Sequence, residues 1–81
     1  MKETRWFEKY RMEWIAETLR IFGFINREHL MLKFGISAPQ AAKDFAAFLK
    51  LNPDAMHYDT SLKKYIANSS INKRIYKQYV L

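Results

Sequence analysis

Apolar residues recur with a helical period through the first two-thirds of the chain and form short extended runs after Pro53. This pattern predicts helices over residues 4–22, 27–34 and 38–51, a β-hairpin over 55–67 and a short C-terminal helix over 70–80. A chain of 81 residues has room for one domain, so we expect residues 1–81 to fold as a single, mainly α unit.

Capping residues mark both ends of the second predicted helix and the start of the third. Asn26 can cap a helix that ends at Gly35, where a left-handed backbone is tolerated. Ser37 caps the next helix, Gln40 completes a Ser-x-x-Gln capping box, and Pro39 lies in the first turn. Two short helices joined by a tight turn are typical of a helix-turn-helix, whose second helix enters the major groove of DNA.

Helical spacing separates an inner and an outer face on these helices. The residues expected to point inward are Leu30, Leu32 and Phe34 on the second helix, and Ala41, Phe45, Phe48 and Leu49 on the third. The outer face of the third helix carries Pro39, Gln40, Lys43, Ala46, Ala47 and Lys50. Asp44 lies to the side, where we expect it to take part in helix packing or to pair with an Arg or Lys, rather than to read bases. An outer face of small and basic residues suits contact with nucleic acid.

The first helix has two apolar stripes. One contains Trp6, Phe7, Tyr10, Trp14 and Ile21, and the other contains Met12, Ile15, Ala16, Leu19 and Phe22. A three-helix core needs one such face, so the C-terminal segment, the hairpin or another subunit would cover the second. The alternative is one wide stripe that wraps into the core.

The segment after Pro53 indicates a wing. Residues 55–58 and 63–67 form two short strands around a turn, with Tyr58 and Tyr65 as the expected anchors to the core. Residues 23–26 are expected only to turn the chain into the second helix. Three helices followed by a two-stranded β-hairpin define a winged helix-turn-helix, to which a short C-terminal helix is added.

The C-terminal segment combines an apolar stripe with positive charge. Ile71, Ile75 and Tyr79 share a stripe, and three basic residues lie among them. A helix of about ten residues is marginally stable alone, so we expect it to dock on another surface.

Charge and composition narrow the partners. The 14 Lys and Arg residues exceed the eight Asp and Glu residues, for a net charge of +6. A basic domain favours polyanions, nucleic acid first among them, although such charge also serves solubility. There is no Cys, which excludes a disulfide framework. No signal segment or membrane-length apolar run is present, so the expected location is the cytoplasm, at the nucleoid.

Catalysis and metal binding find little support in the sequence. His29 and His57 lie far apart, without Cys or a carboxylate at ligand spacing, and no Gly-rich phosphate loop is present. We therefore expect no enzymatic activity, no metal and no cofactor. His29 is expected to be a partly exposed surface residue, and His57 to touch phosphate or face solvent.

The stretch from Trp14 to Ala67 resembles a known pattern. Its most specific parts are F-G-I-S-x-x-Q-A and Y-D-x-S-x-K-x-Y, which are similar to the N-terminal winged helix of BrxR/CapW-type transcriptional repressors, regulators found with bacterial phage-defence systems. More loosely, S-A-P-Q-A-A-K-D-F is similar to the recognition helix of DeoR-type repressors. The resemblance implies operator binding by a homodimer, with Ser37, Gln40 and Lys43 at the start of the recognition helix and the hairpin as wing.

The resemblance also has a limit. Those repressors continue into a WYL ligand-sensing domain and a dimerisation domain, whereas this sequence ends at Leu81. Ligand sensing is not carried over, and no small-molecule ligand or membrane partner is expected. A compact regulator of this kind would fit a phage or mobile element.

The expected function is therefore sequence-specific binding of double-stranded DNA by a homodimeric repressor. The residues expected to contact DNA are Arg27, Lys33, Ser37, Ala38, Pro39, Gln40, Lys43, His57, Thr60, Ser61, Lys63 and Lys64. The expected dimer interface contains Trp6, Tyr10, Trp14, Ile71, Ile75 and Tyr79. The alternative is a protein-interaction module that uses the aromatic first helix and the face of the third helix.

Overall fold

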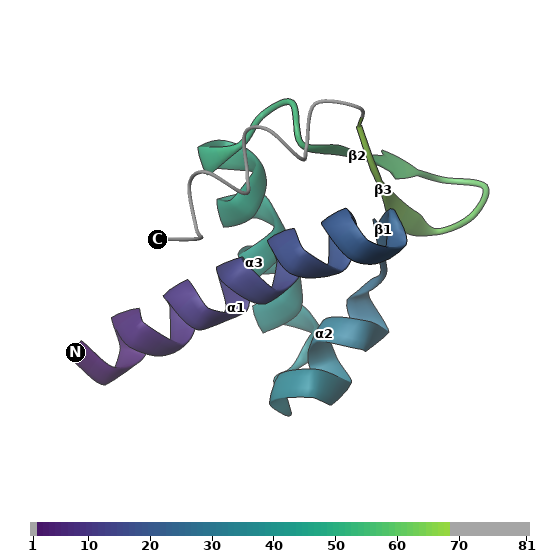
Figure 1. Cartoon of the computed structure of the whole chain (residues 1–81). Helices are drawn as coiled ribbons and strands as arrows, with labels where there is room; N and C mark the ends of the chain where they lie inside the picture. The colour runs from purple at the N-terminus through teal and green to yellow at the C-terminus, as the bar shows by residue number, and fades with distance from the viewer. Residues whose placement is uncertain (1, 69–81) are drawn as a thin grey trace.

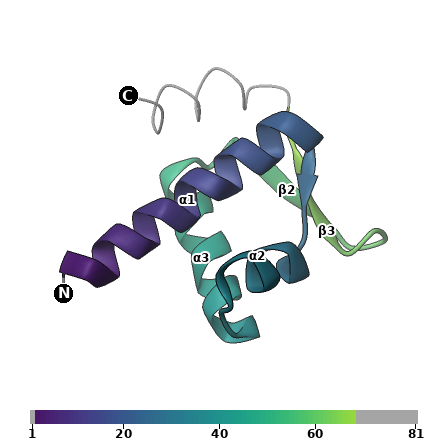
Figure 2. The ribbon, with the colours of Figure 1, turned by 60° about the horizontal axis from the view of Figure 1, so that its bottom comes forward.

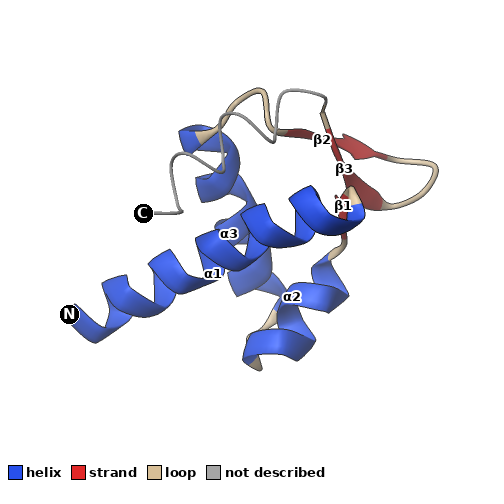
Figure 3. Ribbon diagram, viewed as in Figure 1, coloured by secondary structure: helices blue, strands red, loops and turns tan. Residues whose placement is uncertain are grey.

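The structure is a computed structural model that describes the backbone of residues 2–68 and the side chains of residues 6–68. The elements in chain order are α1 (Lys2–Phe22), β1 (Phe24–Ile25), α2 (Arg27–Phe34), α3 (Ala38–Leu51), β2 (Met56–Asp59) and β3 (Lys64–Ala67) (Figure 1, Figure 3). The predicted C-terminal helix over 70–80, with Ile71, Ile75 and Tyr79, lies outside the described residues.

Three helices and a small antiparallel sheet confirm the winged helix-turn-helix class. Figure 2 shows α1 crossing over α3, with α2 packed beside them. The hairpin of β2 and β3 projects from one end of this body, and the N-terminal half of α1 extends from the other (Figure 1). None of the described helices combines the length and the apolar character needed to cross a membrane.

The sheet has one strand more than the sequence pattern predicts. Phe24 and Ile25 pair with Ile66 and Tyr65, which gives the order β1-β3-β2. The expectation that residues 23–26 only turn the chain was therefore wrong. A strand of two residues is too short to show an alternating pattern, and it forms because β3 offers a second edge once β2 has paired with the first.

The core lies between the three helices and the sheet. Its buried residues are Met12, Ile15, Ala16, Leu19, Ile25, Leu30, Ala41, Phe45, Phe48, Ala55 and Met56. Phe45 and Phe48 are the largest, and burying each such side chain contributes about 1.5–3 kcal/mol. One apolar stripe of α1 therefore supplies the core, as the sequence predicts, while the other remains largely at the surface.

Two of the large apolar residues exposed on α1 and α2 are Phe22 and Leu32, and Leu32 was expected inside. Leu32 on α2 is 84% exposed, because a residue two positions from buried Leu30 lies on the opposite side of a helix. Phe22, in the last turn of α1, lies beside Phe24 and Leu32 around an open apolar hollow.

The expected capping box occurs at α2 instead of α3. Asn26 Oδ1 accepts a hydrogen bond from the His29 N–H at 2.9 Å, and His29 Nδ1 accepts one from the Asn26 N–H at 3.3 Å. At α3, Ser37 Oγ accepts from the Gln40 N–H at 3.2 Å. The Gln40 side chain does not complete this box, because it turns to Asp44. Gly35 ends α2 with a φ of 64°, the left-handed conformation that glycine tolerates.

Candidate nucleic-acid interface

The outward face of α3 is exposed and has no acidic side chain. Pro39, Lys43, Ala46 and Lys50 recur at helical spacing along it, and all four are exposed. Gln40 and Ala47, which were expected on the same face, are half-buried, because Gln40 bonds Asp44 and Ala47 packs against the core. The helix starts after the exposed N-cap Ser37, with Ala38 half-buried. Small and basic side chains at this face allow the helix to approach a polyanion closely, and Lys43 lies nearest the N-terminal part that usually meets bases.

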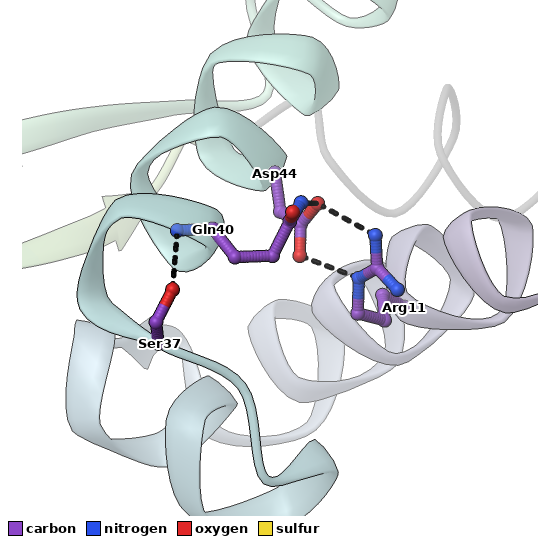
Figure 4. Close-up of polar contacts among 4 residues, drawn as sticks. All are labelled: Arg11, Ser37, Gln40 and Asp44. Carbon is purple, nitrogen blue, oxygen red and sulfur yellow. Dashed lines mark hydrogen bonds and ion pairs between the residues drawn. The ribbon is translucent and has the colours of Figure 1, made fainter. Parts of the chain in front are cut away.

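The one acidic residue of α3 is withdrawn from this face by an ion pair. Asp44 is 2% exposed and pairs with Arg11 of α1, whose Nε lies 2.6 Å from Oδ2 and whose Nη2 lies 3.1 Å from Oδ1 (Figure 4). The expectation that Asp44 pairs with an Arg or Lys is confirmed. Gln40 Nε2 donates to the same Oδ1 at 3.0 Å.

A cleft lies between the start of α2, the middle of α3 and the wing. It has a volume of about 320 Å³ and is lined by Arg27, Glu28, Ala42, Phe45, Tyr58, Lys63 and Tyr65. Two of the predicted contact residues, Arg27 and Lys63, thus come together from separate elements. Their positive charges, together with the negative charge of Glu28, lie on one side of α3.

The wing is anchored through Tyr65. Its ring stacks on Phe45 of α3 with a centroid distance of 4.5 Å, and Tyr58 contacts Tyr65 edge-to-face at 4.9 Å. Tyr58 itself is 49% exposed, so the expectation that both tyrosines anchor in the core was wrong for Tyr58. Burial raises the pKa of the Tyr65 hydroxyl, neighbouring Tyr58 raises it further, and the charge of Arg27 opposes the shift.

The turn of the wing is closed by Asp59. Its Oδ1 accepts from the Leu62 N–H at 2.8 Å, and its carbonyl oxygen accepts from the Lys63 N–H at 2.7 Å. Lys63 adopts a φ of 57°, a left-handed conformation uncommon for a residue with a side chain. Thr60 and Ser61 are exposed at the tip.

Three other predicted contact residues lie away from the cleft. Lys64 Nζ lies 4.1 Å from the centre of the Phe24 ring, a cation–π contact with β1. His57 Nδ1 donates to Asn68 Oδ1 at 2.6 Å, and His57 pairs with Ile66, on the opposite face of the sheet from Tyr65. Lys33 is exposed in the last turn of α2, at the other end of that helix from Arg27.

Sequence reasoning missed two contributors to this region. Tyr58 faces the cleft, and the hairpin register that places it opposite Tyr65 was the available signal. Arg11 was not identified because its partner lies 33 positions away. An Asp among apolar residues of α3 indicates a buried partner, but it does not indicate which cation supplies it.

An aromatic band follows α1 and the end of α2. Trp6 stacks on Tyr10 at 5.4 Å, and Tyr10 and Trp14 each meet Phe34 edge-to-face at 5.7 and 5.8 Å. Trp6 is 59% exposed, and Tyr10 is exposed as well. The described residues therefore leave a large apolar surface on α1 open to a partner.

Comparison with known proteins agrees with this architecture. A model of the BrxR transcriptional regulator winged helix-turn-helix domain matches residues 8–80. The chain is similar to the DNA-binding transcriptional repressor CapW of Escherichia coli (strain KTE188), with 46% identity over 61 residues, which cover 75% of this chain and 20% of that protein. CapW of Pseudomonas aeruginosa is 42% identical over 66 residues, or 82% of this chain and 22% of that protein.

CapW of Stenotrophomonas maltophilia is 40% identical over 65 residues, or 80% of this chain and 22% of that protein. The chain thus spans about a fifth of the length of these relatives. The resemblance seen in the sequence is confirmed, and the fold and the length of the match lead to one assignment. The chain belongs to the family of BrxR transcriptional regulator winged helix-turn-helix domains.

Proposed function

We propose that this chain binds double-stranded DNA and represses transcription, with α3 as the helix that enters the major groove. The observation that carries the proposal is the acid-free outward face of α3, bordered on one side by a cleft with Arg27 and Lys63. Duplex DNA presents phosphates along the edges of the groove, so cations beside the groove helix match the charge of one edge. A bound domain would block access to a promoter, and in a bacterium this DNA lies in the cytoplasm.

Contacts to bases and to phosphates involve different residues in this proposal. Lys43 meets base edges from the first half of α3, with Ser37, Ala38 and Pro39 close to the groove, whereas Gln40 contributes less because its side chain already bonds Asp44. Arg27 and Lys63 bind the backbone, and Thr60 and Ser61 add hydroxyl donors from the wing tip. Lys64 and His57 contribute less, because their side chains already contact Phe24 and Asn68.

The relatives support repression as the outcome of binding. The CapW proteins of three bacterial genera carry the description of DNA-binding transcriptional repressor, and this chain matches about a fifth of each. That fifth overlaps the winged helix-turn-helix matched by the family model. A specific site for one such helix is short, so repression by this chain needs either a second copy or further contacts.

A homodimer formed through α1 supplies the second copy. The band of Trp6, Tyr10, Trp14 and Phe34 offers aromatic side chains of the kind enriched in interfaces. Trp6 and Tyr10 are exposed, while Trp14 and Phe34 pack against the core. Two-fold packing of this band would present two α3 helices to half-sites about one helical turn of DNA apart. We favour a second copy of this chain over an unrelated protein as the partner of this band, because helix-turn-helix proteins commonly bind two-fold symmetric operators as dimers.

A salt titration tests the DNA proposal against the alternative of a protein-interaction module. We expect the logarithm of the association constant for duplex DNA to fall linearly with the logarithm of salt concentration, by about 0.9 for each phosphate contact. Binding that is insensitive to salt would instead indicate an apolar interface and contradict the proposal.

A further inference from the structure

Tyr58 lies on the face of the wing that is turned toward α3. It pairs with Tyr65 in the antiparallel register of β2 and β3, and paired residues of adjacent strands point to the same face of a sheet. The Tyr65 ring stacks on Phe45 of α3 with a centroid distance of 4.5 Å, so this face of the sheet is the one that meets α3. Tyr58 contacts Tyr65 edge-to-face at 4.9 Å and is 49% exposed, and it therefore forms a half-exposed wall of the cleft between the wing and α3.

The polar groups of this cleft are not used within the part of the chain that the structure describes. Its two cations, Arg27 and Lys63, form no ion pair with a described residue, and neither tyrosine hydroxyl makes a hydrogen bond to one. Every buried side-chain nitrogen or oxygen atom among the described residues has a partner, so these groups are open to solvent. Two cations and two hydroxyls on the walls of one cleft are therefore available to a ligand from outside.

The charges around the two hydroxyls favour an anion. Burial raises the pKa of the Tyr65 hydroxyl, neighbouring Tyr58 raises it further, and the charge of Arg27 lowers it, so the guanidinium acts on this pair of hydroxyls. A tyrosine hydroxyl is protonated at neutral pH and can donate one hydrogen bond. With two cations against one acid, Glu28, the cleft suits a ligand that carries a negative charge and oxygen acceptors.

We propose that this cleft holds one phosphate of the DNA backbone, with Arg27 and Lys63 supplying positive charge and the Tyr58 hydroxyl donating an uncharged hydrogen bond to it. Backbone phosphates run along the edge of the groove in which α3 would lie, and tyrosine hydroxyls are among the groups that contact phosphate oxygens in protein–DNA complexes. Tyr65 is a positioning residue, because its ring, stacked on α3, supports the ring of Tyr58. This inference rests on the proposed DNA binding and adds a neutral contact residue, together with an acid, Glu28, whose charge opposes the same phosphate.

Two variants of the full chain test this contact in salt titrations with a specific and a shuffled duplex. Tyr58→Phe removes the hydroxyl and keeps the ring against Tyr65. We expect it to lower the affinity for both duplexes about tenfold with an unchanged log–log salt slope, because a neutral donor releases no counterion. Glu28→Gln should raise both affinities about two- to threefold, since it removes a repulsive charge from the cleft. Glu8→Gln, the same charge change at an exposed residue of α1, is the matched control and should have a smaller effect.

Full affinity in Tyr58→Phe, or a loss that appears only in Tyr58→Ala, would show that Tyr58 serves packing and would overturn the proposal. Equal effects of Glu28→Gln and Glu8→Gln would also overturn it, because the acid would then act through net charge alone. If thermal melting shows Tyr58→Phe to be unfolded, the contrast between these two glutamate variants decides.

Inorganic phosphate, added at constant ionic strength, separates the DNA backbone from free phosphate as the ligand of the cleft. We expect it to leave the DNA complex intact, because a free phosphate makes none of the contacts of α3. Displacement of DNA by millimolar phosphate would show that the cleft takes free phosphate and would overturn the assignment to the backbone. A wild type that binds neither duplex would instead overturn the proposed function itself.

Discussion

Lys63 and Lys64 are neighbours in the chain, yet their side chains lie at different places on the wing. Lys63 lines the cleft beside α3 with Arg27, whereas Lys64 Nζ lies over the Phe24 ring of β1. The left-handed φ of 57° at Lys63 marks the point where the turn joins β3. Because the two lysines carry the same charge at different places, a substitution of Lys64 is the control for a substitution of Lys63.

Lys63→Gly should weaken binding to all DNA sequences about equally and flatten the log–log salt slope by about 0.9, the value for one phosphate contact. Glycine suits the left-handed backbone at this position, so the loss of charge comes without loss of the turn. Lys64→Ala should leave the slope nearly unchanged. Equal slopes for Lys63→Gly and the wild type would place the cleft away from DNA.

Lys43→Ala should lower specific binding at least tenfold while the fold survives. The side chain is exposed on the outward face of α3, so its removal leaves the core intact, and a lysine contact to guanine is worth about 1–3 kcal/mol of discrimination. Fluorescence anisotropy measures the affinities for the specific and the shuffled duplex, and their ratio gives the discrimination. Lys9→Ala, an equal charge change on exposed α1, is the control. If Lys43→Ala keeps the wild-type ratio of specific to non-specific affinity, Lys43 does not take part in base recognition.

Asn26→Ala should destabilise the fold by about 1 kcal/mol or more, because it breaks a reciprocal capping box. Ser37→Ala removes only one hydrogen bond to the backbone of α3 and should cost less. Urea denaturation followed by circular dichroism gives both values. A larger loss for Ser37→Ala would contradict the role of His29 as the second half of the box.

Stability should fall as the pH rises above about 10, the ordinary pKa of tyrosine. The pKa of Tyr65 is raised in the folded state, so the unfolded chain loses this proton first and the folded state binds more protons in that window. The contribution of Tyr65 to stability is complete below the pKa of tyrosine in the unfolded chain, and it disappears as the pH rises past the pKa of Tyr65 in the folded state. Tyr65→Phe, which keeps the stacking on Phe45, should reduce the alkaline loss in urea denaturation. If Tyr65→Phe loses as much stability at high pH as the wild type, the alkaline loss arises from other groups.

Replacing Trp6 and Tyr10 together with alanine should yield a folded monomer with weaker operator binding. Both side chains are exposed and outside the core, so the double change removes interface area and spares the fold. Ile21→Ser, at another exposed apolar residue of α1, is the control. Light scattering measures the mass, and an intact chain that is monomeric at tens of micromolar while binding its operator tightly would contradict the dimer.

Local chemistry made the helix-turn-helix predictable. Asn26, Gly35 and Ser37 act on the backbone within a few residues, and they fix both ends of α2 and the start of α3. The exposure of Leu32 could also have been predicted from the sequence, because it follows from helical spacing alone. In a helix as short as α2, alternating apolar residues such as Leu30 and Leu32 fall on opposite faces, so only one of them reaches the core.

Long-range pairing could not be predicted in the same way. The Arg11–Asp44 ion pair and the pairing of Phe24 with Ile66 join residues that only the folded chain brings together. The same holds for the different positions of Lys63 and Lys64, since a period of two in a strand says which residues share a face but not which face meets α3. The candidate site was therefore predicted as a set of residues, and the structure shows which of them lie together and which lie apart.

The most direct test of the account is a competition gel shift with the intact chain and the duplex that flanks its own gene. We expect a retarded complex, and we expect unlabelled specific duplex to compete for it at least about a hundredfold better than a shuffled duplex of equal length. A hundredfold is just below the specificity ratio of about 10³–10⁷ that is typical of specific regulators, as expected for a single small domain. Equal displacement by the two competitors, or no complex at low salt, would contradict sequence-specific binding of DNA by α3.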